Sequence, residues 1–411
     1  MRLYVWRGAT RNFGDELNGL LWPHLLPGLL DPDPGDSGLR DPGLRDPNLI
    51  DPNLLDPSLL DPSLLELGQI DPGRLADDAL DLFLGIGSVL DARHPADRRK
   101  IVAGAGFGGY EAPATLDGSW QIYWVRGPRT ARQLGLCASF GLGDPASLLP
   151  LVHPVARHDT GAIGFMPHFE SLARGAWPQA AAAAGVTLID PRNAPCTILG
   201  QIAGCRMLLS EALHGVIAAD AMRIPWVALA PVAPIHRAKW LDWADALDLT
   251  IRFHALPASS PREYVETAFT PRRHAIRAGL ARIAALADRI DRRSIHLDRA
   301  AASLRQAAAA EPQLSNGLTL ARAQDRMLAR LDTLRADHAA RGGAIARTKE
   351  GQGLRPPGTS PGAGSWTPPR GAAPWIPAKG GALGTLFLGV GHGRGDWAGL
   401  GRRHHTGDRP V

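Results

Sequence analysis

Short runs of apolar residues, each leading through glycine or a polar turn into a helical pattern, organise most of this chain. In the first part, such runs predict strands at 2–6, 80–86, 100–105 and 121–125. In the second part, they predict strands at 162–166, 186–189, 206–209 and 226–229. Helical patterns separate them, among them 14–26 and 170–184. Short, fully apolar strands of this kind are typical of parallel sheets that helices cover on both faces.

The alternation predicts an α/β fold with two Rossmann-like lobes in tandem and a cleft between them. We expect the N-terminal lobe to span 1–154 and the second lobe to span 159–267. A helical extension rich in Ala and Arg follows at 268–341. The tail at 342–411 is a low-complexity segment rich in Gly, Pro and Arg, which we expect to be disordered.

A five-residue Asp-Pro repeat interrupts the first lobe between Asp41 and Leu65. A small solenoid is one interpretation, because a leucine recurs in register. Five short units are too few for a stack that supports itself, and proline removes a hydrogen-bond donor from every unit. We therefore interpret 31–72 as an insertion on the surface of the lobe.

Composition narrows the class of protein. Hydrophobic residues make up 45% of the 411 residues, which is enough for two cores. The N-terminus has the pattern of a strand and not of a signal peptide, no apolar run has the length of a membrane span, and the three cysteines lack metal spacing. We therefore expect a cytoplasmic protein.

The net charge of +5 comes almost entirely from arginine, and the basic residues are not interleaved with aromatic residues along a face. This makes nucleic acid an unfavourable partner. Anionic small ligands remain open as partners, and so does a loose peripheral association with an acidic membrane surface.

The strongest candidate for chemistry is His214. It stands in the first turn of a predicted helix, just after the strand that ends near Ser210. Ligands of doubly wound folds bind at such strand ends, helix N-termini favour anions, and an imidazole exchanges protons near neutral pH. Glu211 lies one helical turn earlier and is placed to orient the ring. The alternative is that His214 only satisfies a hydrogen bond at the start of the helix.

Further candidates follow the strands of the first lobe. Asp15 either caps the first helix or, with Asn12 and Asn18, binds acceptor hydroxyls. Gly85, Gly87 and Ser88 form a strand-end loop that does not match the dinucleotide fingerprint, and they indicate only a close backbone approach.

Cationic candidates come from both lobes. Arg126 and Arg129 flank a Gly-Pro turn and suit phosphate or carboxylate, although a solvated helix start with salt bridges is the alternative. His168 follows the first strand of the second lobe. Lys239 stands beside indoles in a segment that is otherwise explained as an amphipathic helix with Trp in the core.

Several of these segments together resemble the polysaccharide pyruvyl transferase family, and in detail its branch that ketalises bacterial exopolysaccharides. The resemblance covers roughly 1–341 apart from the repeat. It is carried, in order, by Asn12-Phe13-Gly14-Asp15-Glu16-Leu17-Asn18, Gly85-Ile86-Gly87-Ser88, Val125-Arg126-Gly127-Pro128-Arg129, Gly143-Asp144-Pro145-Ala146 and Ser210-Glu211-Ala212-Leu213-His214-Gly215.

The resemblance implies a GT-B-like fold and transfer of pyruvate from phosphoenolpyruvate to two hydroxyls of a sugar or lipid-linked oligosaccharide. His214 would be the acid, with Glu211 as its partner and Asp15 at the acceptor hydroxyl. The donor would be bound by Arg126, Arg129, His168 and Lys239 and by the loop of Gly85, Gly87 and Ser88. No metal or other cofactor is expected.

One position departs from the family pattern, because Ala212 stands where many members carry Arg. Two other functions remain open. One is a GT-B-like glycosyltransferase that uses a sugar nucleotide, and the other is a non-catalytic polysaccharide assembly protein.

Overall fold

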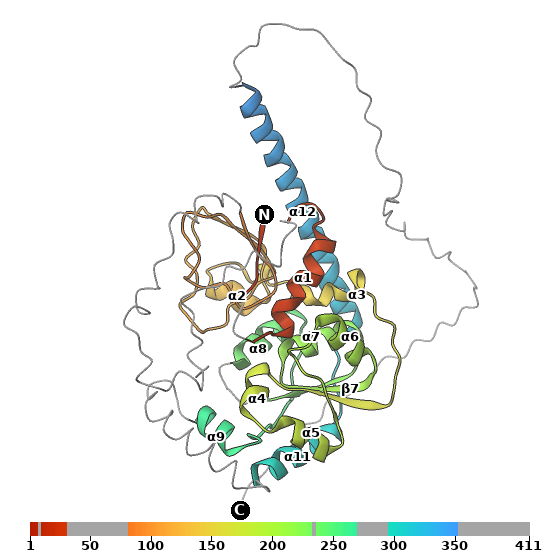
Figure 1. Ribbon diagram of the computed structural model, residues 1–411. Coiled ribbons are helices and arrows are strands. Elements are labelled where there is room, and N and C mark those ends of the chain that lie inside the picture. Colours follow the sequence, from red (N-terminus) through yellow and green to blue (C-terminus); the bar gives the residue numbers. More distant parts are fainter. Residues whose placement is uncertain (7–9, 31–80, 232–235, 269–294, 352–411) are drawn as a thin grey trace, which may run out of the picture. The chain divides into compact units, whose positions relative to one another are not determined.

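The structure is a computed structural model, and it describes residues 1–6, 10–30, 81–231, 236–268 and 295–351, with side chains up to 341 (Figure 1). The Asp-Pro insertion and the tail beyond 351 lie outside the described residues.

Four parallel strands form the first sheet, in the order β1-β2-β3-β4. They are β1 (Arg2–Tyr4), β2 (Leu82–Leu84), β3 (Lys100–Ala103) and β4 (Trp120–Trp124). The described helices of this half are α1 (Phe13–Leu25), α2 (Pro128–Gln133) and α3 (Leu149–Val152), with the 3₁₀ helices η3 (Ala138–Phe140) and η4 (Pro145–Leu148). All residues of β2 and β3 are buried, as their unbroken apolar runs predict.

Five parallel strands form the second sheet, in the order β6-β5-β7-β8-β9. They are β5 (Ala162–Met166), β6 (Thr187–Leu188), β7 (Cys205–Ser210), β8 (Trp226–Leu229) and β9 (Phe253–His254). Six helices accompany them in the described chain: α4 (Phe169–Arg174), α5 (Trp177–Ala184), α6 (Pro195–Ala203), α7 (Leu213–Ala221), α8 (Arg237–Ala246) and α9 (Pro261–Ala268). The predicted mixed α/β fold with two parallel, Rossmann-like sheets is confirmed.

Two local predictions differ from the structure. The prediction of a single helix at 170–184 is wrong, because Gly175 and Ala176 separate α4 from α5. Gly175 leaves the helical conformation, and Pro178 lies in the first turn of α5, where its missing N–H costs nothing. Strand β9, which has only two residues and pairs with β8, was not predicted.

The two halves share one hydrophobic core. Helix α1 buries Phe13, Leu17, Leu21 and Leu25, which are spaced four residues apart and therefore line one face. This helix packs against α6 and α7 of the second half. Met166, Leu208 and Trp226 of the second sheet belong to the same cluster of buried side chains as Leu3 and Phe83 of the first.

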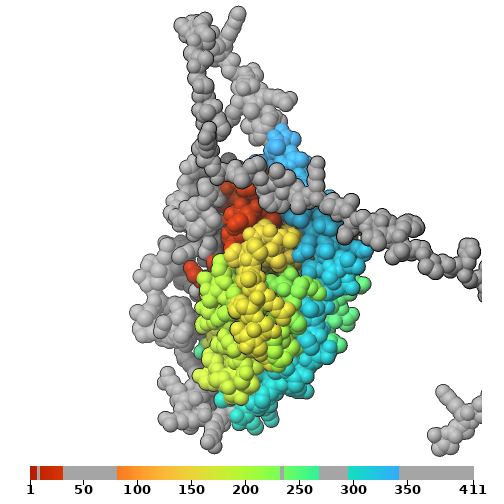
Figure 2. Space-filling view, turned by 90° about the vertical axis from the view of Figure 1, so that its right-hand side faces the viewer, coloured from red at the N-terminus to blue at the C-terminus, as the bar shows by residue number. Residues whose placement is uncertain are grey.

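Two C-terminal helices complete the described chain, α11 (Ile295–Ala308) and α12 (Gly317–Gly351). Helix α11 packs against α5, whereas α12 returns to the first half and contacts β4 and η4. Figure 2 shows the blue surface of α12 beside the yellow surface around residue 150. Helix α12 continues past position 341, where the sequence analysis expected the helical extension to end. None of the described helices combines the length and apolarity that crossing a bilayer requires.

Asp242 of α8 holds the second half against the start of α2. Its Oδ1 accepts hydrogen bonds from the backbone N–H groups of Arg129 (3.0 Å) and Thr130 (2.9 Å). Its Oδ2 accepts from Thr130 Oγ1 (2.6 Å) and from Arg126 Nε (3.1 Å). Position 127 must be glycine here, because a Cβ atom would lie 1.9 Å from the carbonyl oxygen of Asp242.

Replacing Asp242 tests this connection. Asp242→Ala leaves the buried guanidinium of Arg126 without its carboxylate, so we expect the free energy of unfolding to fall by about 3–5 kcal/mol. Asp245→Ala on the same helix is the matched control. It removes the half-exposed carboxylate that pairs with Arg129, and we expect a loss of about 1 kcal/mol or less. Urea unfolding measures both, and equal losses would contradict the assignment.

Candidate functional site

The strand order of the second sheet places a switch point between β5 and β7. The chain runs from β5 outward to β6 and then returns to β7 on the other side of β5. In such folds ligands bind outside the carboxyl ends of the two strands at the switch point. His168 follows β5 and His214 follows β7, so both predicted imidazoles come from this place.

His214 lies between elements of the first half. Its Nε2 is 3.4 Å from Asp144 Oδ2, and its side chain is 15% exposed. Neither of these two atoms has a hydrogen-bond partner within the described chain. Its Nδ1 faces Gly14 of α1 so closely that a Cβ atom there would lie only 2.0 Å away. The ring is therefore held between α1 and η4, with the carboxylate of Asp144 beside it.

Asp15 is the next residue of α1 and lies in the same place. Its Oδ2 accepts a hydrogen bond from Asn12 Nδ2 (2.7 Å). Burial raises the pKa of Asp15 to about 6, while the Asn12 hydrogen bond and the positive charges of His214 and Lys239 oppose that rise. A carboxyl group with such a pKa gains and loses protons near neutral pH. Gly87 follows β2 on the other side, and a Cβ atom there would lie 3.8 Å from Asp15 Oδ1.

Lys239, in the first turn of α8, supplies a positive charge at this place. Its charge acts on Asp15, on His168 and on His236, so it lies near all three. Its side chain is half-buried, and no carboxylate of the described residues forms an ion pair with it. Lys239 therefore adds positive charge to the surroundings of Asp15 and of the two imidazoles.

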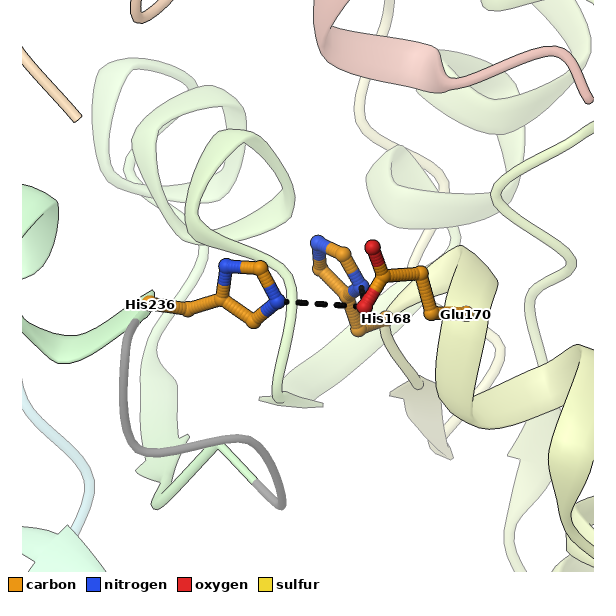
Figure 3. A group of neighbouring side chains, drawn as sticks. All are labelled: His168, Glu170 and His236. Carbon is orange, nitrogen blue, oxygen red and sulfur yellow. Dashed lines mark hydrogen bonds and ion pairs between the residues drawn. The ribbon is translucent and has the colours of Figure 1, made fainter. Parts of the chain in front are cut away.

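His168 belongs to a cluster with Glu170 and His236 (Figure 3). Its ring stacks on His236 with 4.4 Å between the ring centres. Burial and the charges of His236 and Lys239 lower the pKa of His168 well below its usual value. Burial alone would raise the pKa of Glu170, but the His236 hydrogen bond and the surrounding positive charges lower it.

Glu211 does not take the place expected beside the His214 ring. Its Oε2 accepts from the backbone N–H of His168 (2.8 Å), and its Oε1 accepts from Ser171 Oγ (2.9 Å). The carboxylate beside His214 is that of Asp144 instead. Glu211 thereby joins the end of β7 to the turn after β5.

The predicted arginine pair has carboxylate partners in α8. The Arg126 side chain is 1% exposed, and its three nitrogen atoms donate to Asp242, Ser88 Oγ and the carbonyl of Phe107. Arg129 pairs with Asp245 at 2.8 Å. These pairs neutralise both guanidinium groups and join the halves, and Ser88 holds the Arg126 side chain in place.

Two further candidates, Asn18 and Gly85, have structural roles. Asn18 is fully buried, and its amide donates to the carbonyls of Ile86 and Asp15 and accepts from Ile86 N–H and Trp22 Nε1. These four bonds use all the hydrogen-bonding capacity of its side chain, so none remains for an acceptor hydroxyl. Gly85 packs against the indole of Trp22, where a Cβ atom would lie 2.1 Å from Nε1.

Four residues of the site carried no assigned role in the sequence analysis: Asp144, Glu170, His236 and Tyr110. Asp144 stood in one of the quoted motifs, and His236 in the segment of Lys239. Each of these four residues contacts residues that are distant in the sequence. The spacing of residues along the chain does not predict such contacts. A hydroxyl of Tyr110, for example, lies 2.9 Å from His236 Nδ1.

Fold and site together define an α/β protein with two parallel sheets that gathers ionisable side chains at a sheet switch point. The chain is 30% identical over 366 residues to the succinoglycan biosynthesis protein ExoV of Rhizobium meliloti (strain 1021), which covers 82% of this chain and 100% of that protein. The chain belongs to the polysaccharide pyruvyl transferase family. Comparisons with family profiles and with solved structures gave no match.

The contact between α1 and the His214 ring is tested by two alanine substitutions in one helix. Gly14→Ala inserts a methyl group into the space of the ring, so we expect the NMR signals of the His214 side chain to shift. Gly19→Ala meets no atom within 4 Å, so it should leave those signals in place and stabilise the helix by up to about 1 kcal/mol. Unchanged His214 signals in Gly14→Ala would show that the ring lies elsewhere.

Proposed function

We propose that this protein transfers pyruvate from phosphoenolpyruvate onto two hydroxyls of one sugar, forming a cyclic ketal and releasing phosphate. The observation that carries the proposal is the gathering of His214, Asp15 and Lys239 at one place, from both halves of the chain. The relative's name places that protein in succinoglycan biosynthesis, and we propose an exopolysaccharide role for this chain too. The two parallel sheets and the return of α12 to the first half support a GT-B-like arrangement.

The donor carries a carboxylate and a phosphate, so its site must supply positive charge. Lys239 is the cation near Asp15 and His168 that no described carboxylate neutralises. We therefore assign the main contact with the donor's anionic groups to Lys239, with His168 beside it. Lys239 would then take the place of the arginine that many members of the family carry at the position of Ala212.

His214 is the proposed acid. Protonation of the donor's methylene carbon makes the adjacent carbon electrophilic, and a sugar hydroxyl then attacks it. Asp144 orients the imidazole, as a carboxylate does for other catalytic histidines. Asp144 is therefore a positioning residue in this scheme.

Asp15 is the proposed base for the sugar hydroxyls, because its raised pKa suits proton uptake near neutrality. The first hydroxyl adds to the central carbon and loses its proton. The carbon–oxygen bond to phosphate then breaks, and the second hydroxyl closes the ketal. Of the two hydroxyl protons, one balances the proton delivered to the methylene carbon and the other leaves with phosphate. A free sugar or a lipid-linked oligosaccharide can supply both hydroxyls.

The proposal is tested by phosphate release from phosphoenolpyruvate in the presence of lipid-linked oligosaccharides, with the product identified by mass spectrometry. We expect His214→Gln to lose at least about a hundredfold in rate, which is the usual contribution of a general acid. The exposed His158, changed to Gln, is the control and should keep the wild-type rate.

Two outcomes contradict the proposal. Consumption of a sugar nucleotide without use of phosphoenolpyruvate would indicate a glycosyltransferase. Full ketal formation by His214→Gln would remove His214 from the reaction.

A further inference from the structure

His168, Glu170 and His236 bring three potential metal ligands together, although the sequence analysis expected no metal. One ligand atom from each lies within 4.8 Å of the others. His168 and Glu170 come from the turn after β5 and from the start of α4, and His236 precedes α8. Figure 3 shows the two imidazole rings next to each other, with dashed lines joining the Glu170 carboxylate to both.

We propose that these three side chains bind a divalent transition-metal ion of the Zn²⁺ type. Two imidazoles and one carboxylate form a donor set that such ions prefer over Mg²⁺ or Ca²⁺. Glu170 Oε2 lies 3.2 Å from His236 Nε2 and 3.8 Å from His168 Nδ1. Zinc bonds of about 2.0–2.1 Å in tetrahedral geometry separate neighbouring ligand atoms by about 3.3 Å. The three ligand atoms lie within 4.8 Å of one another, so they would have to draw closer by at most about 1.5 Å.

An unsatisfied nitrogen points independently to a missing ligand. His168 Nδ1 is buried and has no hydrogen-bond partner within the described chain, and the whole residue is 6% exposed. Buried polar atoms of native proteins nearly always have a partner, so an atom without one needs an explanation. A metal ion bound to the lone pair of this nitrogen supplies it.

The surroundings hold the ligands in place. Tyr110 OH lies 2.9 Å from His236 Nδ1, which leaves Nε2 of the same ring facing Glu170. Glu211 accepts from the backbone N–H of His168 and fixes the turn that carries this ligand. Such contacts behind the ligands are a usual feature of metal sites.

Nearby cationic side chains limit the affinity of this cluster for a metal ion. Arg174 Nη2 lies 3.3 Å from Glu170 Oε2, and Lys239 is close enough to act on both imidazoles. Their repulsion of a metal ion opposes the attraction by Glu170. Three protein ligands leave a fourth position open, as in catalytic zinc sites, and an anion there would be favoured by Lys239.

The experiment uses the full chain without an affinity tag, first treated with a chelator and then titrated with Co²⁺ and Zn²⁺. We expect one ion per chain, a visible Co²⁺ absorption band that Zn²⁺ displaces, and a melting temperature that rises with Zn²⁺ concentration. His168→Gln, Glu170→Gln and His236→Gln should each weaken binding at least tenfold. His158→Gln should bind like the wild type, because this exposed histidine lies outside the cluster.

Circular dichroism separates loss of binding from loss of folding in each variant. Absence of binding by the wild type, or undiminished binding by all three folded variants, would overturn the proposal and leave Glu170 as a hydrogen-bond acceptor for His236 and Arg174. Metal binding is measured here without phosphoenolpyruvate or acceptor. Its failure is therefore distinct from failure of the proposed transfer reaction.

Discussion

The buried pair of Arg126 and Asp242 fixes how the two halves of this protein meet. The side chains are 1% and 3% exposed, so neither charge has water to stabilise it, and each depends on the other. Asp242 also binds the first N–H groups of α2, and Arg126 also binds Ser88 after β2. One carboxylate of the second half thus holds the ends of two strands of the first.

The chemistry proposed for the site depends on that constraint. His214 comes from the second half, whereas Gly14, Asp15 and Asp144 beside it come from the first. A shift of one half by a few ångströms would separate the imidazole from both carboxyl groups. Lys239 stands in the same helix as Asp242, one turn earlier, so the residue that joins the halves also sets the position of Lys239.

Much of the fold follows from local patterns. The strands at 162–166 and 226–229 were predicted with their observed bounds, because continuous apolar runs and flanking turns define buried parallel strands. The break after Arg174 and the two-residue strand β9 were missed. Both depend on packing against distant residues: Ser259 Oγ, for example, would lie 2.3 Å from a Cβ atom at position 175.

The site was predictable only in part. The sequence placed His168 and His214 at strand ends, and the sheet order brings those ends together at its switch point. The sequence did not show which of the predicted basic residues form an ion pair with a carboxylate. Arg126 and Lys239 were equal candidates in the sequence, yet Asp242, 116 positions away from Arg126, neutralises the arginine. Asp144 replaced Glu211 beside His214 for the same reason, because spacing along a helix does not report contacts between halves.

The proposed reaction requires both halves to form one site in which His214 faces the donor. A crystal structure of the protein with phosphoenolpyruvate, without acceptor, is the decisive experiment. We predict an anionic group of the donor bonded to Lys239 and its methylene carbon about 3.5 Å from the His214 ring, as a reactive geometry requires. A donor bound at a surface arginine such as Arg129, with His214 in contact only with protein, would contradict it.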